Sequence, residues 1–195
     1  MLLEAAKDDR FECLYVLSLT CGLRMGEALG LKWSDIDFEA GTLRVNRQLQ
    51  HIRDGGGLVF SEPKNASRRT IDLPQRALKA LKIHRKRQLE EQLMSATNRE
   101  DNDLVFTSRK GTPLDAQNIV NRYFKPLLRR IELPDIRWHD LRHTCATLLL
   151  GRGVHPKMVQ HLMGHASIQL PLDRHSHWIP SMGRHAADGM DEALG

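Results

Sequence analysis

The sequence has few cysteines and no long hydrophobic run. It contains three cysteines among 195 residues, an odd number without the spacing of a metal-binding motif. We therefore expect Cys13, Cys21 and Cys145 to be reduced packing residues. No apolar run is long enough to cross a bilayer, and Glu4 and Lys7 interrupt the apolar start that a signal peptide would need. These absences predict a cytoplasmic protein without a membrane partner.

Positive charge, in contrast, is in modest excess. Lys and Arg number 29 against 24 for Asp and Glu, so the formal net charge is +5 and the pI is about 9.3. Because the charge is spread along the chain, this surplus favours a polyanionic partner over a membrane, although many soluble domains carry a few spare cations. The length fits one domain with a sizeable core.

Hydrophobic periodicity predicts an α+β fold that is mostly helical, with one small three-stranded antiparallel sheet. Helical spacing of apolar residues predicts helices over Arg10–Thr20, Met25–Leu31, Gln75–Met94, Ala116–Ile131, Leu141–Leu150 and Pro156–Leu162. Alternation with a period of two predicts sheet strands over Thr42–Val45, Leu58–Ser61 and Arg69–Leu73, and a short strand over Leu104–Phe106. In the long charged helix we expect the buried side to be Leu78, Leu81, Leu89 and Leu93.

Two cationic side chains lie next to turns in the first half of the chain. Arg24 follows the turn at Gly22 and begins a helix, so its planar guanidinium can face a phosphate. The alternative is an ion pair with Glu27 on an exposed helix face. Lys64 lies in a loop between two strands, where its ammonium can protonate a leaving oxygen or simply stay solvated.

The second half of the chain adds two histidines and an arginine. His139 and Arg142 are three residues apart across a helix start, so both can project to one side. We expect Arg142 to face solvent and to add little to the core. The alternative is that Asp140 caps the helix and the histidines are ordinary polar surface. His165 follows the helix-stopping Gly164, where it can donate a hydrogen bond to a phosphoryl oxygen.

Together these segments resemble the catalytic domain of the tyrosine recombinases, the phage-integrase family. The resemblance covers nearly the whole chain. In chain order, residues 20–37 resemble the family's first box with its arginine, 63–73 the strand-turn-strand with its lysine, 139–144 the His-x-x-Arg box, and 162–168 the Leu-Gly-His-x-x-Ile box, with Met163 inserted before the glycine.

The resemblance implies a site and a reaction. The residues that match the family's catalytic positions are Arg24, Lys64, His139, Arg142 and His165. The implied activity is site-specific cleavage and rejoining of duplex DNA through a covalent 3′-phosphotyrosyl intermediate. It also implies that no metal or nucleotide cofactor is used, and that the protein associates with itself on DNA.

The chain departs from the family pattern ten residues beyond His165. Where the family resembles Asp-x-Tyr-Ser-His, residues 173–177 read Asp-Arg-His-Ser-His, so His175 occupies the position of the nucleophile. The chain contains two tyrosines, Tyr15 and Tyr123, and both lie in helical stripes that packing explains. Neither is a plausible substitute for the missing hydroxyl.

Three interpretations of His175 are open. It is an inactivating change, natural or engineered, in an otherwise intact recombinase; or it is a histidine nucleophile, whose phosphoramidate adduct would be labile; or the domain serves DNA binding alone. We expect a DNA-binding domain that is cleavage-deficient, and the alternative is a non-catalytic DNA-binding protein derived from a recombinase. Pro171 is expected to disturb the helix that leads to this position.

The expected domain organisation is simple. Residues 1–178 form the catalytic domain, and 179–195 form a weakly amphipathic tail that docks either on its own chain or on a neighbouring protomer. The family's separate amino-terminal DNA-clamping domain has no counterpart in the sequence. We therefore expect the chain to be part of a longer integrase.

Overall fold

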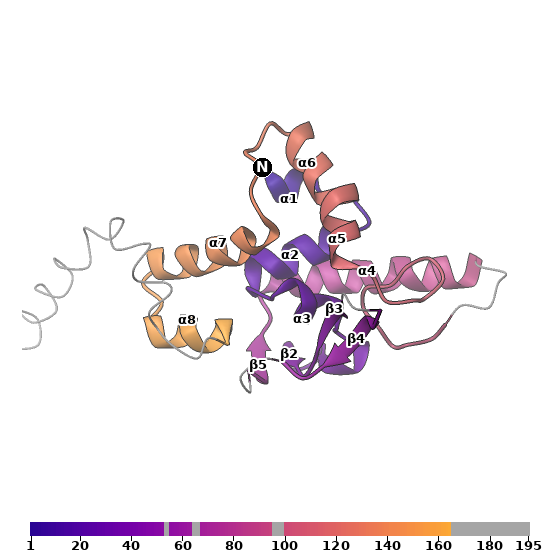
Figure 1. Cartoon of the computed structure of the whole chain (residues 1–195). Coiled ribbons are helices and arrows are strands. Elements are labelled where there is room, and N and C mark those ends of the chain that lie inside the picture. Colours follow the sequence, from indigo (N-terminus) through magenta and orange to yellow (C-terminus); the bar gives the residue numbers. More distant parts are fainter. Residues whose placement is uncertain (53–54, 64–66, 95–99, 165–195) are drawn as a thin grey trace, which may run out of the picture.

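Helix α2 (Glu12–Thr20) forms the centre of the fold in the computed structural model, which describes residues 1–52, 55–63, 67–94 and 100–164. Every residue from Cys13 to Ser18 is buried, because other elements cover this helix on all sides. Helices α4 (Gln75–Met94) and α7 (Trp138–Gly151) both pack against it. Figure 1 shows α4 extending from the body on one side and α7 with α8 (Pro156–Met163) extending on the other.

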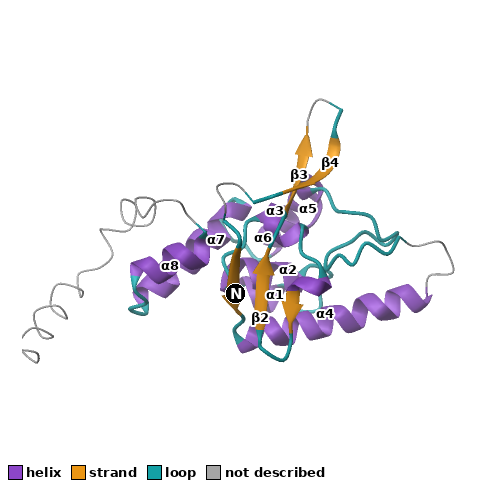
Figure 2. Ribbon diagram, turned by 90° about the horizontal axis from the view of Figure 1, so that it is seen from below, coloured by secondary structure: helices purple, strands orange, loops and turns teal. Residues whose placement is uncertain are grey.

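A three-stranded antiparallel sheet, in the order β1-β2-β5, packs below this helical layer. Its strands are β1 (Ile36–Asp37), β2 (Thr42–Val45) and β5 (Arg69–Asp72), and Leu43 lies opposite Ile71. A separate two-stranded hairpin is formed by β3 (Gln48–Ile52) and β4 (Gly57–Ser61). Figure 2 shows this hairpin projecting away from the sheet.

The predicted membership of the sheet is therefore partly wrong. The segment predicted at Leu58–Ser61 belongs to the separate hairpin, and the third strand of the sheet is β1. The sequence did not indicate β3, because the two adjacent residues Gln48 and Leu49 are both buried and the alternation is lost. Similarly, the segment predicted as a strand at Leu104–Phe106 makes one isolated bridge, between Leu104 and Lys32.

The remaining helical elements are α1 (Leu2–Ala5), α3 (Met25–Leu29), the 3-10 turn η1 (Trp33–Asp35), and a continuous run of α5 (Ala116–Ile119), the π-helical turn η3 (Val120–Phe124) and α6 (Lys125–Arg130). Of these, α1 and η1 were not predicted, and the others follow the predicted segments with shifted ends and one π-helical turn. Helix α7 begins at Trp138 because Asp140 completes a capping box, accepting a 2.8 Å hydrogen bond from the Arg137 backbone N–H. Asp140 thus caps the helix, as one of the two interpretations predicted.

The buried side of α4 differs from the prediction at its C-terminal end. Leu81 is fully buried, whereas Leu89 is 51% exposed and Leu93 is 88% exposed. At Leu89 the reason is the direction of the buried face, because the adjacent Gln88 is buried and donates to the Leu104 and Val105 carbonyls. Leu93 lies near the end of α4, which extends past the rest of the body (Figure 1). Periodicity predicts which residues share a helix face, but not how far the neighbouring elements extend along it.

Two apolar clusters hold the helices together. The larger one contains the rings of Tyr15, Phe124 and Trp138, whose centroids lie 5.0–6.1 Å apart. A smaller one joins α7 to α8 through Cys145, Ala146, Leu150, Val159 and Met163. All three cysteines are free and buried, as predicted. Within the described ranges, no helix combines the length and the hydropathy that a membrane-spanning segment requires.

Candidate functional site

Arg24 is the N-cap of α3 and lies between a buried carboxylate and the end of α8. Its Nη1 donates to Glu27 Oε1 at 2.5 Å, its backbone N–H donates to Glu27 Oε2 at 2.9 Å, and its Nη2 donates to the Gly164 carbonyl at 3.0 Å. The Arg24 side chain is 32% exposed and that of Glu27 only 1%. The ion pair considered from the sequence is present, but its carboxylate lies inside the protein and not on an exposed helix face.

Arg142 lies next to Arg24 but is buried. Its Nη1 donates to the Gly22 carbonyl, 120 positions away in sequence, and its Nη2 donates to the Met163 carbonyl. The Arg142 side chain is 2% exposed, so the expectation that it faces solvent is wrong. The reason is that α7 packs beside both the turn before α3 and the end of α8, and the carbonyls of these two segments hold the guanidinium.

Burial lowers the pKa of Arg142 but does not remove its positive charge at neutral pH. Burial, and then the charge of the neighbouring Arg24, lower the pKa of Arg142 to about 9, against the opposing effect of Glu27. The guanidinium therefore still carries its charge at neutral pH. Its Nε atom is buried and has no hydrogen-bond partner among the described residues.

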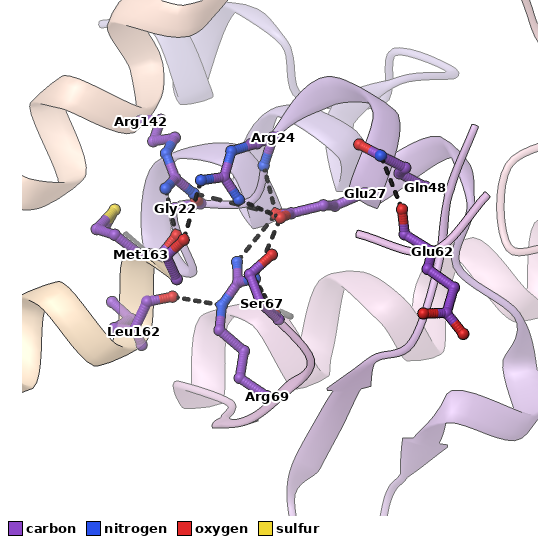
Figure 3. A network of polar contacts seen from close by, with 11 residues as sticks. Gly22, Arg24, Glu27, Gln48, Glu62, Ser67, Arg69, Arg142, Leu162 and Met163 are labelled. Carbon is purple, nitrogen blue, oxygen red and sulfur yellow. Dashed lines mark hydrogen bonds and ion pairs between the residues drawn. The ribbon is translucent and has the colours of Figure 1, made fainter. Parts of the chain in front are cut away.

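Arg69 and Glu27, which the sequence did not single out as site residues, complete the cluster. Arg69, the first residue of β5, donates to both oxygens of Glu27, at 3.1 and 2.9 Å, and its side chain is 2% exposed. Arg142 Nη1 lies 4.0 Å from Glu27 Oε2. Figure 3 shows the three guanidiniums converging from different elements on this one carboxylate. The cluster thus carries three positive charges and one negative charge.

A sequence signal for Arg69 did exist. In β5 the residues Arg69 and Ile71 are buried while Thr70 and Asp72 are exposed, so Arg69 occupies an inward-facing position of a strand. A charged residue at such a position needs a buried partner.

Burial alone would raise the pKa of Glu27, but the hydrogen bonds and charges of Arg69 and Arg24 outweigh it, so the pKa lies below its ordinary value.

The backbone at Gly22 lets these segments approach each other. Gly22 has φ +60°, and a Cβ atom there would lie 2.4 Å from Met163 Cε and 2.8 Å from Met163 Sδ. An L side chain would be strained by the backbone and would clash with the end of α8. Gly22 therefore allows its own carbonyl and that of Met163 to meet the same Arg142 guanidinium.

His139 lies at the exposed edge of the same cluster. It is on the first turn of α7, and its ring lies edge-on to His143 with centroids 4.6 Å apart. Partial burial lowers the pKa of His139, and the charges of His143, Arg142 and Arg24 lower it further. His139 is therefore a neutral imidazole at neutral pH. In this form it has one N–H donor and one acceptor nitrogen.

Three of the site residues predicted from the sequence lie outside the described residues. They are Lys64, His165 and His175, and the same holds for Pro171 and the tail 179–195. The structure thus brings together Arg24, Arg142 and His139. No group of three or more His, Cys, Asp or Glu side chains within the described ranges is arranged to hold a metal ion.

Comparison with known proteins identifies the family. The model of the phage integrase family matches residues 2–172, so the chain belongs to that family. The tyrosine recombinase XerC-like protein of Caldanaerobacter subterraneus is 37% identical, over 97% of this chain and 51% of its own length. The ICEBs1 integrase of Bacillus subtilis is 29% identical, over 94% and 49%. The chain spans about half the length of these curated relatives.

Solved structures support the same conclusion for the fold. The Tn1549 transposon integrase in complex with circular intermediate DNA superposes with a TM-score of 0.80 at 25% identity, covering 97% of this chain and 64% of that one. The XerA recombinase gives a TM-score of 0.69 at 27% identity, covering 88% and 55%. The predicted class, a mostly helical α+β tyrosine-recombinase catalytic fold with a small antiparallel sheet, is confirmed.

Proposed function

We propose that the chain is the catalytic domain of a site-specific DNA recombinase or integrase, and that Arg24 and Arg142 bind a backbone phosphate of duplex DNA. The observation that carries this proposal is the charge of the cluster. Arginines from α3 and α7 lie side by side although one carboxylate cannot neutralise the three guanidiniums around it. Such an excess attracts an anion, and a planar guanidinium matches phosphate oxygens geometrically.

The chemistry of the reaction fits this arrangement. During phosphoryl transfer, negative charge builds on the nonbridging oxygens, and cations already fixed in place stabilise it without reorganising. Arg142 is held by the Gly22 and Met163 carbonyls, and Arg24 by Glu27 and the Gly164 carbonyl. In the proposal the neutral His139 hydrogen-bonds to the phosphate, His165 does the same, and Lys64 protonates the leaving oxygen.

His175 determines what this domain does with the bound DNA. It occupies the position at which the family carries its tyrosine nucleophile, so we infer a domain that binds DNA and is cleavage-deficient. The alternative is a non-catalytic DNA-binding protein derived from a recombinase. In both cases we propose that residues 1–178 form the domain with the tyrosine-recombinase catalytic fold, without a metal or nucleotide cofactor, and that 179–195 form a tail that docks on its own chain or on a neighbouring protomer.

The relatives support duplex DNA as the partner. The structure of the Tn1549 transposon integrase is a complex with circular intermediate DNA. The excess of basic residues over the whole sequence agrees with a polyanionic partner. We therefore expect weak binding of the isolated domain to duplex DNA that weakens steeply as salt is added.

A salt titration of DNA binding tests the proposal. Binding of the full chain to a fluorescent duplex is measured by anisotropy over a range of salt concentrations, for the unmodified protein and for Arg24→Gln. Each lost phosphate contact lowers the slope of log K against log salt by about 0.9. The matched control is Arg76→Gln, which removes an exposed arginine of α4, 57% exposed and 3.5 Å from Glu4.

The proposal predicts a smaller slope for Arg24→Gln and an unchanged slope for Arg76→Gln. Binding that does not depend on salt would contradict the assignment of a polyanionic partner. Equal slopes for the unmodified protein and Arg24→Gln would contradict the assignment of a phosphate to Arg24.

A further inference from the structure

Glu27 is the shared acceptor of the arginine cluster. The side chain of Arg69 donates more hydrogen bonds to it than the side chain of Arg24 does. Arg69 donates to both carboxylate oxygens, at 3.1 and 2.9 Å, whereas Arg24 places one side-chain nitrogen on Oε1. The side chains of Arg69 and Glu27 are 2% and 1% exposed. In addition, all three guanidinium nitrogens of Arg69 donate to protein acceptors, namely Glu27 and the Leu162 and Ser67 carbonyls, so its charge is directed at the protein interior.

The pairing with Arg69 determines how much of Arg24 is available. A buried carboxylate is costly unless it is paired and hydrogen-bonded. Without Arg69, the Glu27 carboxylate would therefore hold more of the N–H donors of Arg24. With Arg69 present, the Arg24 side chain makes two hydrogen bonds to described residues, to Glu27 and to the Gly164 carbonyl. A guanidinium has more N–H donors than these, and this one is 32% exposed.

Arg69 also contacts the segment at the end of α8. Its Nε donates to the Leu162 carbonyl at 2.7 Å, and its Nη1 donates to the Ser67 carbonyl at 3.1 Å. A Cβ atom on Gly164, which has φ +59°, would lie 2.8 Å from Arg69 Nη1. Arg69 thus packs directly against Gly164, whose carbonyl accepts from Arg24. In the sequence, His165 follows this glycine directly.

We propose that Arg69 is a positioning residue, which satisfies the buried Glu27 carboxylate so that Arg24 remains free to bind a DNA phosphate, and which fixes the end of α8 beside Arg24. This role rests on the proposed DNA-binding function. It requires no contact between Arg69 and DNA. Removing Arg69 alone should weaken DNA binding, and removing the charge of Glu27 as well should restore part of it.

A double-mutant cycle tests this role. Arg69→Met keeps much of the apolar stem and removes the guanidinium, and Glu27→Gln keeps the shape of the carboxylate and removes its charge. We expect Arg69→Met to bind duplex DNA about tenfold to a hundredfold more weakly, which corresponds to one lost charged hydrogen-bond contact. Its salt slope should fall by about 0.9. The double variant should recover the slope and part of the affinity, because the contacts of Arg69 with the Leu162 and Ser67 carbonyls stay lost.

A matched control separates positioning from general destabilisation. Arg47→Met removes another arginine that pairs with a mostly buried carboxylate, Asp35, with side chains 26% and 4% exposed. It should lower the unfolding midpoint without changing the salt slope. If Arg69→Met does not fold, Arg69→Lys is used in its place. A lysine ammonium keeps the charge but cannot donate to Glu27 and to the Leu162 and Ser67 carbonyls at the same time. Faster amide hydrogen exchange at Met163 and Gly164 is then the expected result.

The outcomes distinguish this inference from the function on which it rests. If the unmodified protein shows no salt-dependent binding, the proposed function fails. If it binds, and Arg24→Gln lowers the slope while Arg69→Met leaves it unchanged, the function stands and the role of Arg69 is overturned. A double variant that binds no better than Arg69→Met would also overturn it, because neutralising Glu27 removes the carboxylate that is proposed to hold Arg24 away from the DNA. With Arg69→Lys, unchanged hydrogen exchange would overturn it too.

Discussion

Gly22→Ala should be among the most damaging small substitutions in this protein. At φ +60°, an alanine pays about 1–2 kcal/mol for the left-handed backbone. Its Cβ would also lie 2.4 Å from Met163 Cε, the end of a flexible side chain. Because Met163 is fully buried, its displacement overpacks a filled interior, which costs about 1–3 kcal/mol. We therefore expect the free energy of unfolding to fall by about 2–5 kcal/mol, as the sum of these two contributions.

Two other glycines separate the backbone cost from the packing cost. Gly153 has φ +75° and nothing within 4 Å of an added Cβ. Gly153→Ala should therefore lower the free energy of unfolding through backbone strain alone, by about 1–2 kcal/mol. Gly151, at the end of α7, has neither the positive φ nor a near neighbour, so its replacement by alanine should stabilise by about 0.4–1 kcal/mol. Urea denaturation followed by circular dichroism gives all three values.

The ranking of the three variants is the decisive result. If Gly22→Ala costs no more than Gly153→Ala, the close approach of Met163 to the Gly22 turn is wrong. The hydrogen bonds that hold Arg142 between those two segments would then be in doubt as well. A trimmed partner gives a second check, because Met163→Ala should recover part of the loss in Gly22→Ala by removing the atoms that clash.

Further predictions concern acid stability, a histidine and the reach of the core. Because the pKa of Glu27 lies below the ordinary 4.5, the unfolded chain binds the extra proton, so unfolding free energy should drop below pH 4.5, and less steeply in Glu27→Gln. Imidazole NMR titration should give His139 a pKa below 6.5 that rises in His143→Gln, since the charge of His143 helps to lower it. In thermal melts, Leu81→Ala should cost about 2–5 kcal/mol and the exposed Leu93→Ala less than about 0.5.

The sequence predicted local structure well wherever local patterns determine it. The bounds of α4 and β2 agree with the structure, and Gly164 ends α8 in a left-handed conformation, as a helix-stopping glycine should. The hairpin was missed because strand pairing depends on which segments meet in space. A strand such as β3, with two adjacent buried residues, has no period-two pattern to reveal it.

The candidate site was predictable in part. Arg24, Arg142 and His139 are brought together, but the burial of Arg142 depends on the Gly22 turn and the end of α8, which no spacing within α7 can indicate. The alternation of β5 signalled that Arg69 is buried, but its role was missed because it depends on a carboxylate 42 positions away in sequence. Lys64, His165 and His175 stay predictions from the family pattern.

Covalent attachment to DNA tests the central claim most directly. The unmodified protein, His175→Tyr, and His175→Tyr combined with Arg24→Gln are incubated with a nicked suicide duplex that carries the cognate site, and adducts are separated on a denaturing gel. A phenol with a pKa of about 10 serves both as nucleophile and as leaving group, so we predict an adduct with His175→Tyr. The unmodified protein should give none, and Arg24→Gln should abolish the adduct of the tyrosine variant. No adduct with His175→Tyr, or an adduct that survives the loss of Arg24, would contradict the account.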